Sequence, residues 1–181
     1  VQTGDMGISE SGELKPGHEP GIEIRAKYTI LGEGCRGHLG KQIINKYNLN
    51  DGKDPQHYGI GFKEVWKLDK NIHEPGLVIH TNGWPTSFDT PSGSYFYHGE
   101  NNEAYIGYVI PLDYKNPHLS PFDEFQMWKT HPSIKKYLKN GERISYGARA
   151  LIKGGLQSLP KMEFPGGLLV GDNAGTLNFS K

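Results

Sequence analysis

The sequence predicts an α/β + β fold, in which an antiparallel sheet interrupts α/β material. Both ends of the chain show a strand followed by a glycine-rich turn, at residues 21–40 and 166–175. Residues 56–110 are instead rich in aromatic and β-branched residues, broken by Pro, Gly and Asn turns. The 25 glycines and 12 prolines also favour turns and short strands over a helical bundle. We therefore divide the chain into α/β residues 1–50, a β-rich domain 51–140 and a return to α/β structure at 141–181.

The α/β elements lie at the two ends. A strand at 21–31 enters the glycine turn 32–40 and continues into a short amphipathic helix at 41–47. Near the other end, a short apolar strand at 166–171 leads into what reads as the start of a helix at Asp172. The chain begins at Val1 without a leader and stops soon after that helix start, so we expect a fragment of a longer protein.

The middle of the chain predicts an antiparallel sheet with one face covered. Ser120 and Pro121 mark the start of a covering helix, as N-cap and first helical residue. The expected elements are four strands, at 57–68, 76–81, 94–98 and 104–110, and two helices, at 121–129 and 132–138.

Charge and composition exclude several classes of function. Lys plus Arg equals Asp plus Glu at 20 each, so no net field draws the chain to nucleic acid or to an anionic membrane. No stretch approaches the roughly 20 apolar residues that span a bilayer, so any membrane contact is peripheral. The single cysteine, Cys35, cannot ligate an iron–sulfur cluster and reads as a structural thiol. The eight histidines show no metal-binding spacing, and no nucleophile motif is present.

The run Leu168-Leu-Val-Gly-Asp-Asn-Ala-Gly175 is the strongest local signal for chemistry. Asp172 at the carboxyl end of a buried strand is placed to accept hydrogen bonds from sugar hydroxyls. The small residues after it allow a pyrophosphate to approach a helix N-terminus, an arrangement typical of FAD enzymes. The alternative is that Asp172 only caps a helix.

Two further segments are weaker candidates. The turn Gly32-Glu-Gly-Cys-Arg-Gly-His-Leu-Gly40 permits close backbone approach, and its Arg36 can pair with a phosphate or fix the loop as a solvated surface residue. The run Thr90-Pro-Ser-Gly-Ser-Tyr-Phe-Tyr-His98 sets small residues beside three aromatic ones. It predicts either a flat apolar slot that suits a quinone ring or a hairpin turn with core aromatics.

Taken together, these segments resemble the electron transfer flavoprotein–ubiquinone oxidoreductase family over nearly the whole chain. Long irregular strings are more specific than any glycine motif, and they carry the resemblance. They include Glu33-Gly-Cys-Arg-Gly-His-Leu-Gly-Lys-Gln42, Tyr58-Gly-Ile-Gly-Phe-Lys-Glu-Val-Trp66, His80-Thr-Asn-Gly-Trp-Pro85, Leu119-Ser-Pro-Phe122, Tyr146-Gly-Ala-Arg-Ala150, Gln157-Ser-Leu-Pro-Lys161 and Phe164-Pro-Gly-Gly167.

The resemblance implies an internal fragment: part of an FAD-binding Rossmann-like domain with an inserted antiparallel-sheet quinone-binding domain. It assigns Gly34, Arg36 and Gly37 to an FAD-contacting loop. It implies that the Ser92–Gly93 turn meets the quinone, with Ser92 standing where the family has glycine. A positive φ at Ser92 would cost on the order of 1 kcal/mol, so we expect Gly93 to suit that contact better. The residues implied at the ribityl and diphosphate groups are Gly171, Asp172, Ala174 and Gly175.

The function implied is electron transfer from reduced electron transfer flavoprotein, through FAD and a [4Fe–4S] cluster, to ubiquinone. No catalytic side chain is implied, and the cluster ligands lie outside this chain. The implied location is the surface of the mitochondrial inner membrane or the bacterial cytoplasmic membrane. We expect the 181-residue piece to be inactive alone. The alternatives are a geranylgeranyl-reductase-like flavoprotein, or a non-catalytic module that binds quinone or protein.

Overall fold

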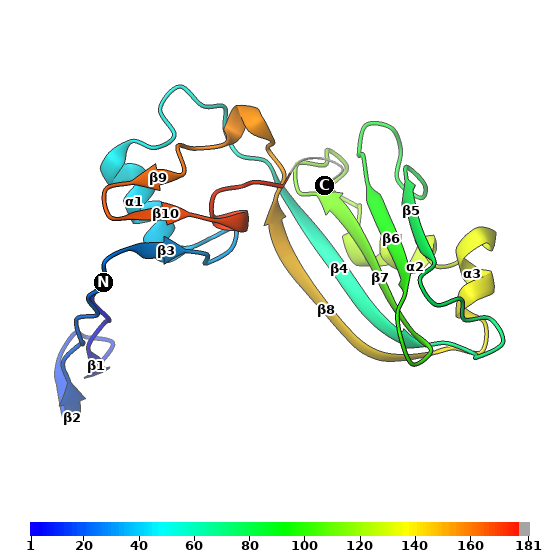
Figure 1. The fold of residues 1–181 in the computed structure, drawn as a ribbon, viewed down its shortest axis with the longest axis horizontal. Helices are drawn as coiled ribbons and strands as arrows, with labels where there is room; N and C mark the ends of the chain where they lie inside the picture. Colours follow the sequence, from blue (N-terminus) through cyan, green and yellow to red (C-terminus); the bar gives the residue numbers. More distant parts are fainter. Residues whose placement is uncertain (178–181) are drawn as a thin grey trace.

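The computed structural model describes residues 1–177, which form two units joined by long strands, with a hairpin at the N-terminus (Figure 1). The hairpin pairs β1 (Met6–Ile8) with β2 (Leu14–Glu19). The smaller unit holds β3 (Thr29–Leu31), α1 (His38–Tyr47), the 3₁₀ turns η1 (Leu156–Ser158) and η2 (Gly171–Asn173), β9 (Glu163–Phe164) and β10 (Gly167–Leu169). The larger unit holds β4 (Tyr58–Lys67), β5 (Val78–Asn82), β6 (Gly93–His98), β7 (Glu103–Pro111), α2 (Pro121–Trp128), α3 (Pro132–Leu138) and β8 (Glu142–Ile152).

The larger unit is an antiparallel five-stranded sheet in the order β5-β6-β7-β4-β8. Side chains alternate along β6 and β7, so one face collects the buried residues and packs against α2 and α3. The members of this core include Phe96, Ile106, Tyr108 and Ile110 of the strands with Phe125, Trp128 and Ile134 of the helices. The predicted sheet and its single helix-covered face are therefore confirmed.

The two covering helices begin and end close to their predicted positions. Ser120 caps α2 as expected, because its hydroxyl accepts the N–H of Asp123 at 3.3 Å. Beneath α2, the Glu64 carboxylate is buried in the sheet and receives Lys129 Nζ at 2.8 Å and Arg143 at 3.4 Å. Two cations thus compensate one buried anion, which ties α2 to β4 and β8.

The smaller unit joins segments from opposite ends of the sequence. β10 pairs in parallel with β3, so Gly167 lies opposite Thr29 and Leu169 opposite Leu31. α1 packs on one face of this sheet around Leu31 and Leu169. Because parallel neighbours end at the same edge, the turn after β3 and the turn after β10 lie together.

Three predictions about the fold need correction. Only 29–31 of the predicted strand 21–31 is a strand, because its earlier residues meet no sheet beyond one bridge at Glu23. The boundary at 140/141 is too early, because β8 pairs along the whole of β4, and the return to the smaller unit begins after Ile152. The segment from Asp172 is only the turn η2 within residues 1–177, and the rest of that predicted helix lies outside the described residues.

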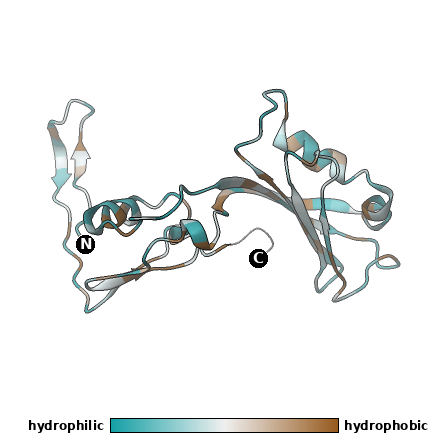
Figure 2. Cartoon of the chain, turned by 90° about the horizontal axis from the view of Figure 1, so that it is seen from above, coloured by the Kyte–Doolittle hydropathy of each residue, from teal (hydrophilic) through white to brown (hydrophobic). Residues whose placement is uncertain are grey.

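The two units meet where β4 and β8 emerge from the larger sheet, as Figure 2 shows from above. Across this junction the Cys35 thiol donates to the Ala150 carbonyl at 3.3 Å, and Asp172 Oδ2 accepts the N–H of Ile152 at 3.3 Å. No helix within residues 1–177 is long and apolar enough to cross a membrane.

Candidate functional site

A cavity of about 810 Å³ lies on the face of the five-stranded sheet that the helices leave open. Its walls come from β5, β6 and β7, from Leu151 and Lys153 at the end of β8, and from Leu177. The residues used below are His80, Ser92, Gly93, Tyr95, Tyr97, Val109, Leu151 and Lys153, with Leu177 closing one side.

Glycines keep the floor of this pocket low. Gly93 shares the open face with Tyr95 and Tyr97, and a Cβ there would meet nothing nearer than the Thr81 carbonyl oxygen at 3.9 Å. The Tyr95 ring lies flat on Gly107 of β7, where a Cβ would stand only 2.3 Å from the ring. The missing side chain at Gly93 therefore leaves open space, and the missing side chain at Gly107 lets the Tyr95 ring lie close to the sheet.

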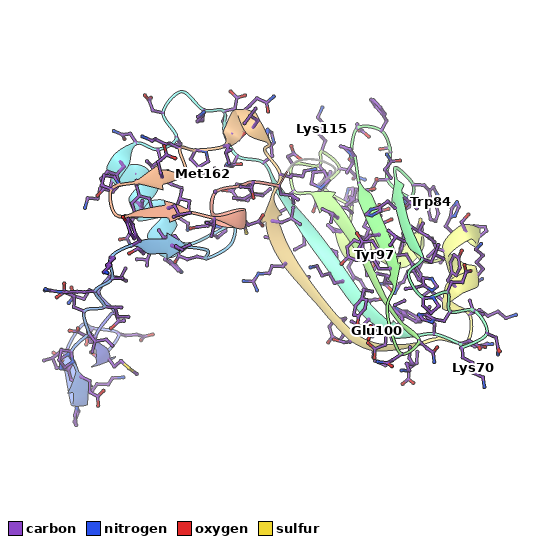
Figure 3. The ribbon with its side chains drawn as sticks, viewed as in Figure 1. Lys70, Trp84, Tyr97, Glu100, Lys115 and Met162 are labelled. Carbon is purple, nitrogen blue, oxygen red and sulfur yellow. The ribbon has the colours of Figure 1, made fainter. Side chains whose placement is uncertain are left out.

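One side of the pocket is aromatic. Tyr95 and Tyr97 stack with ring centroids 4.7 Å apart, and Tyr97 OH lies 3.2 Å from His80 Nε2 on β5. Figure 3 labels Tyr97 in the middle of the sheet. Burial raises the pKa of Tyr95, so its hydroxyl stays protonated at neutral pH. A flat ligand with polar edges would meet both an aromatic surface and hydrogen-bonding groups here.

Lys153 brings the positive charge of this pocket. Its side chain is half-buried just beyond β8, beside Leu151. Burial lowers the pKa of Lys153, and nearby Asp113 acts in the opposite direction. A carbonyl oxygen or a developing negative charge on a ligand would be stabilised by this ammonium group.

Ser92 and Gly93, the two residues predicted at the quinone, both line the pocket, and the condition for strain at Ser92 is not met. Neither residue has a positive φ, so serine fits this backbone without conformational cost. The Ser92 hydroxyl is buried and bonds to Tyr108 OH at 2.6 Å and to the Gly83 carbonyl at 2.9 Å. Its side chain is therefore held by the protein itself.

Of the three aromatic residues predicted beside this turn, only two line the pocket. Tyr95 and Tyr97 face it, whereas Phe96 points to the opposite face and is completely buried in the core. The alternation of a strand explains the division. The apolar slot and the core aromatics were alternatives in the sequence, and β6 contains both: Tyr95 and Tyr97 face the pocket, and Phe96 faces the core.

A second, smaller cavity of about 240 Å³ joins three of the predicted cofactor residues. Arg36 and Gly37 reach it from the turn after β3, and Ala174 from the turn after β10. Two polar atoms at this cavity, Asn173 Oδ1 and Gln56 Oε1, are buried without a hydrogen-bond partner among the described residues. Such orphaned atoms beside a cation suit a polar ligand.

The predicted glycine Gly37 is needed for packing. A Cβ on Gly37 would lie 2.4 Å from Asn173 Nδ2 and 2.6 Å from a Glu33 oxygen. Glu33, in the turn before α1, places its carboxylate at the N-terminus of that helix, where it accepts the N–H of Gly40 at 2.7 Å. Burial acts to raise the pKa of Glu33, but bonds from the N–H groups of the α1 start lower it below its ordinary value. An anionic ligand would therefore find this helix N-terminus already taken.

The remaining predicted residues take structural positions at the same edge. Gly34, Gly171 and Gly175 have φ values of 83°, 58° and 84°, which only glycine adopts readily. Gly34 also accepts Asn173 Nδ2 at 3.4 Å. Asp172 uses one oxygen on the N–H of Ile152, which leaves the other for a further hydrogen bond. The structure thus places these residues at one edge of the small sheet, while their ligand roles stay predictions.

Several pocket residues were not singled out from the sequence. His80, Lys153 and Leu151 come from strands whose open face is visible only once the sheet order is known. Asn173 and Gln56 become notable only through their unpaired buried atoms. Within residues 1–177, no group of three or more His, Cys, Asp or Glu side chains is placed to hold a metal ion.

Comparison with known proteins gives a consistent relationship. A family model described as "ETF-QO, ubiquinone-binding" matches residues 58–151, more than half of the chain. The chain is 58% identical over its whole length to an electron transfer flavoprotein–ubiquinone oxidoreductase of Pseudomonas aeruginosa, of which it covers 33%. It is 51% identical to the mitochondrial protein of the same name from Homo sapiens, of which it covers 30%. The chain thus spans about a third of the length of the curated relatives it matches.

Solved structures share the fold at low identity. A flavin-dependent brominase, Bmp2, in a triple mutant, matches with a TM-score of 0.58 and 16% identity, over 89% of this chain and 40% of that one. A geranylgeranyl bacteriochlorophyll reductase-like protein from Thermoplasma acidophilum matches with a TM-score of 0.59 and 15% identity, over 85% of this chain and 36% of that one. These likenesses concern the arrangement of strands and helices alone.

Proposed function

The chain belongs to the ETF-QO ubiquinone-binding family, and from this membership we propose that the pocket on the open sheet face binds the headgroup of ubiquinone. The observation that carries the proposal is the position of the family match. Residues 58–151 run from the start of β4 to one residue before the end of β8 and so cover all five strands of the sheet beneath the pocket. Most of the lining residues fall within that range.

The chemistry of the pocket supports a quinone. A quinone ring is flat and apolar with a carbonyl at each end, so it needs a flat surface and polar groups at its edges. Tyr95 and Tyr97 offer the aromatic surface, and the bare backbone at Gly93 allows close approach. His80 and Lys153 provide donors toward a carbonyl oxygen. In this proposal the backbone at Ser92 and Gly93 meets one end of the ring.

We further propose that the edge formed by the turns after β3 and β10 contacts FAD, as part of a Rossmann-like domain. The cavity at Arg36 and Ala174 is large enough for only part of such a dinucleotide. Arg36 would pair with a phosphate, and the free oxygen of Asp172 would accept a ribityl hydroxyl. Gly34, Gly37, Gly171 and Gly175 would shape the backbone around the ligand. When bound, FAD would supply the redox centre of the protein.

The complete proposal is an oxidoreductase that passes electrons from reduced electron transfer flavoprotein to ubiquinone, of which this chain forms part. A [4Fe–4S] cluster would need cysteines outside this chain, because Cys35 is the single cysteine here. Access to a lipid-soluble quinone requires contact with the surface of a mitochondrial inner or bacterial cytoplasmic membrane. The 181-residue piece alone is proposed to be inactive, since it offers only part of the cofactor cradle.

A glycine pair on one sheet gives a direct test of the pocket. Gly93→Val fills the floor of the cavity, whereas Gly147→Val, on exposed strand β8, meets nothing within 4 Å and is the matched control. Both variants are made in the protein expressed at its natural gene boundaries. We expect Gly93→Val to raise KM for a short-chain ubiquinone by about tenfold or more and to leave reduction of ferricyanide unchanged. An unchanged KM would contradict the proposed site.

The visible spectrum of the same protein separates the proposal from its alternatives. Flavin bands with an iron–sulfur shoulder, bleached by reduced electron transfer flavoprotein, support the oxidoreductase. Flavin bands without the shoulder would favour a geranylgeranyl-reductase-like enzyme, which shares the fold. A colourless folded protein would leave the non-catalytic binding module.

A further inference from the structure

The loop of residues 83–92 is closed at its neck by two bonds between the same residues. Gly83 N–H donates to the Ser92 carbonyl at 3.2 Å, and Ser92 Oγ donates to the Gly83 carbonyl at 2.9 Å. Pro91, Ser92 and Gly93 at this neck line the large pocket. The position of the neck therefore sets one wall of the proposed quinone site.

Three hydroxyl groups converge on this neck in a directed chain. Tyr108 OH donates to Ser92 Oγ at 2.6 Å, and Thr86 Oγ1 lies 2.6 Å from Ser92 Oγ and 2.8 Å from the Gly83 oxygen. Each hydroxyl has one proton to give. Tyr108 donates its hydrogen bond to Ser92 Oγ, so the Ser92 and Thr86 hydroxyls are left to donate to the Gly83 oxygen, either directly or one through the other. Such chains strengthen each member where water is excluded, and Tyr108 and Ser92 are 1% and 2% exposed.

The start of this chain is rigid because Tyr108 belongs to the core. It projects from β7 to the face opposite the pocket, where its ring lies 6.2 Å from Phe125 and 6.3 Å from Trp128 of α2. Burial raises the pKa of Tyr108, which keeps its hydroxyl protonated as a donor. A fixed core residue thus anchors the neck of a loop whose Phe88 is fully accessible.

We propose that Tyr108 is a positioning residue of the quinone pocket: its hydroxyl holds Ser92 and thereby fixes the neck of the 83–92 loop that forms the pocket wall. Tyr108 touches no ligand, since it acts from the helix-covered face through Ser92. The role assigned toward quinone rests on the proposed function, whereas the anchoring of the loop does not.

The test compares two tyrosines of one strand. Tyr108→Phe keeps the aromatic ring in the core and removes the hydroxyl that donates a hydrogen bond to Ser92. Tyr105→Phe is the matched control, because Tyr105 is partly exposed and, among residues 1–177, its hydroxyl bonds only to Glu103 at 3.1 Å. Ser92→Ala and the double variant complete a cycle. All are made in the natural-length protein, with reduced electron transfer flavoprotein as donor and a short-chain ubiquinone or ferricyanide as acceptor.

We expect Tyr108→Phe and Ser92→Ala each to raise KM for ubiquinone about fivefold, as the loss of one buried hydrogen bond allows, with kcat and ferricyanide reduction unchanged. KM of the double variant should not exceed the higher KM of the two single variants, because both substitutions remove the same hydrogen bond. Tyr105→Phe should match the parent. Additive effects, or equal losses with ferricyanide, would overturn the positioning role.

Limited proteolysis measures how firmly the 83–92 loop is held, independently of any ligand. Chymotrypsin cleavage after Phe88, followed by mass spectrometry, should be about fivefold faster in Tyr108→Phe and unchanged in Tyr105→Phe. No change would overturn the anchoring itself. Faster cleavage with an unchanged KM would overturn the role toward quinone and would place the ligand elsewhere. A parent protein that does not reduce ubiquinone would instead overturn the proposed function.

Discussion

Adding one methyl group at Gly107 should lift Tyr95 into the pocket. A Cβ there would lie 2.3 Å from the Tyr95 ring, whereas ordinary contact begins near 3.4 Å, so the ring must move by about 1 Å. The backbone of β7 blocks movement toward the sheet, and the ring can only rise into the cavity. Overpacking of this kind costs about 1–3 kcal/mol, and a loss of similar size in quinone binding is a roughly tenfold rise in KM.

The assay measures the urea midpoint and KM for short-chain ubiquinone in Gly107→Ala, with Gly147→Ala as the control. Gly147 has no atom within 4 Å of an added Cβ, so alanine there should raise stability by about 0.5 kcal/mol through chain entropy. A second background removes the clash: in Tyr95→Ser, the Gly107→Ala change should cost little. The reasoning is refuted if Gly107→Ala behaves like Gly147→Ala in both measurements.

Three other predictions concern charge and pH. Glu64→Gln should destabilise the protein by about 3 kcal/mol, because Lys129 and Arg143 lose their buried anion; Lys129→Met in addition should recover part of that loss in the urea midpoint. Burial lowers the pKa of His98 from 6.5, so its stabilising contribution is complete above that pH and is lost as the pH falls below it; His98→Asn should flatten the pH dependence of the melting temperature between pH 7.5 and 5.5. Glu33→Gln should cost about 1 kcal/mol at neutral pH by weakening the bonds to the α1 N-terminus, and, because the pKa of Glu33 is lowered, the difference from the parent should begin to shrink below its ordinary value of 4.5 and vanish as the pH falls through the lowered pKa of the folded protein.

Local patterns in the sequence were sufficient for four of the five strands of the larger sheet and for its two helices. Alternation along 94–98 predicts which residues share a face, and Ser120 with Pro121 fixes the start of α2. The strand predicted at 21–31 was too long, because a strand needs a pairing partner and only residues 29–31 have one. That partner, residues 167–169, lies far along the chain and could not be read from the local pattern. The same reason explains the early boundary at 140, since the partner of β8 is β4.

The candidate site was predictable as an edge but not as a pocket. The glycine turns at 32–40 and 171–175 were each noted in the sequence, and the structure places them side by side because both follow strands that pair in parallel. What single residues do there depends on contacts that sequence spacing cannot reveal. A serine where the family has glycine would be strained only at a positive φ, which Ser92 does not have, and its hydroxyl bonds to Tyr108 of the neighbouring strand on the same face. Gly37 read as open backbone, yet Asn173 fills the space beside it.

Photolabelling with an azido-ubiquinone tests the central claim most directly. The natural-length protein is labelled with and without excess unmodified quinone, digested, and the labelled peptides are identified by mass spectrometry. The account predicts competed label within residues 80–109, on the strands that carry Gly93, Tyr95 and Tyr97. Competed label confined to other parts of the protein would contradict a quinone site on the open face of this sheet.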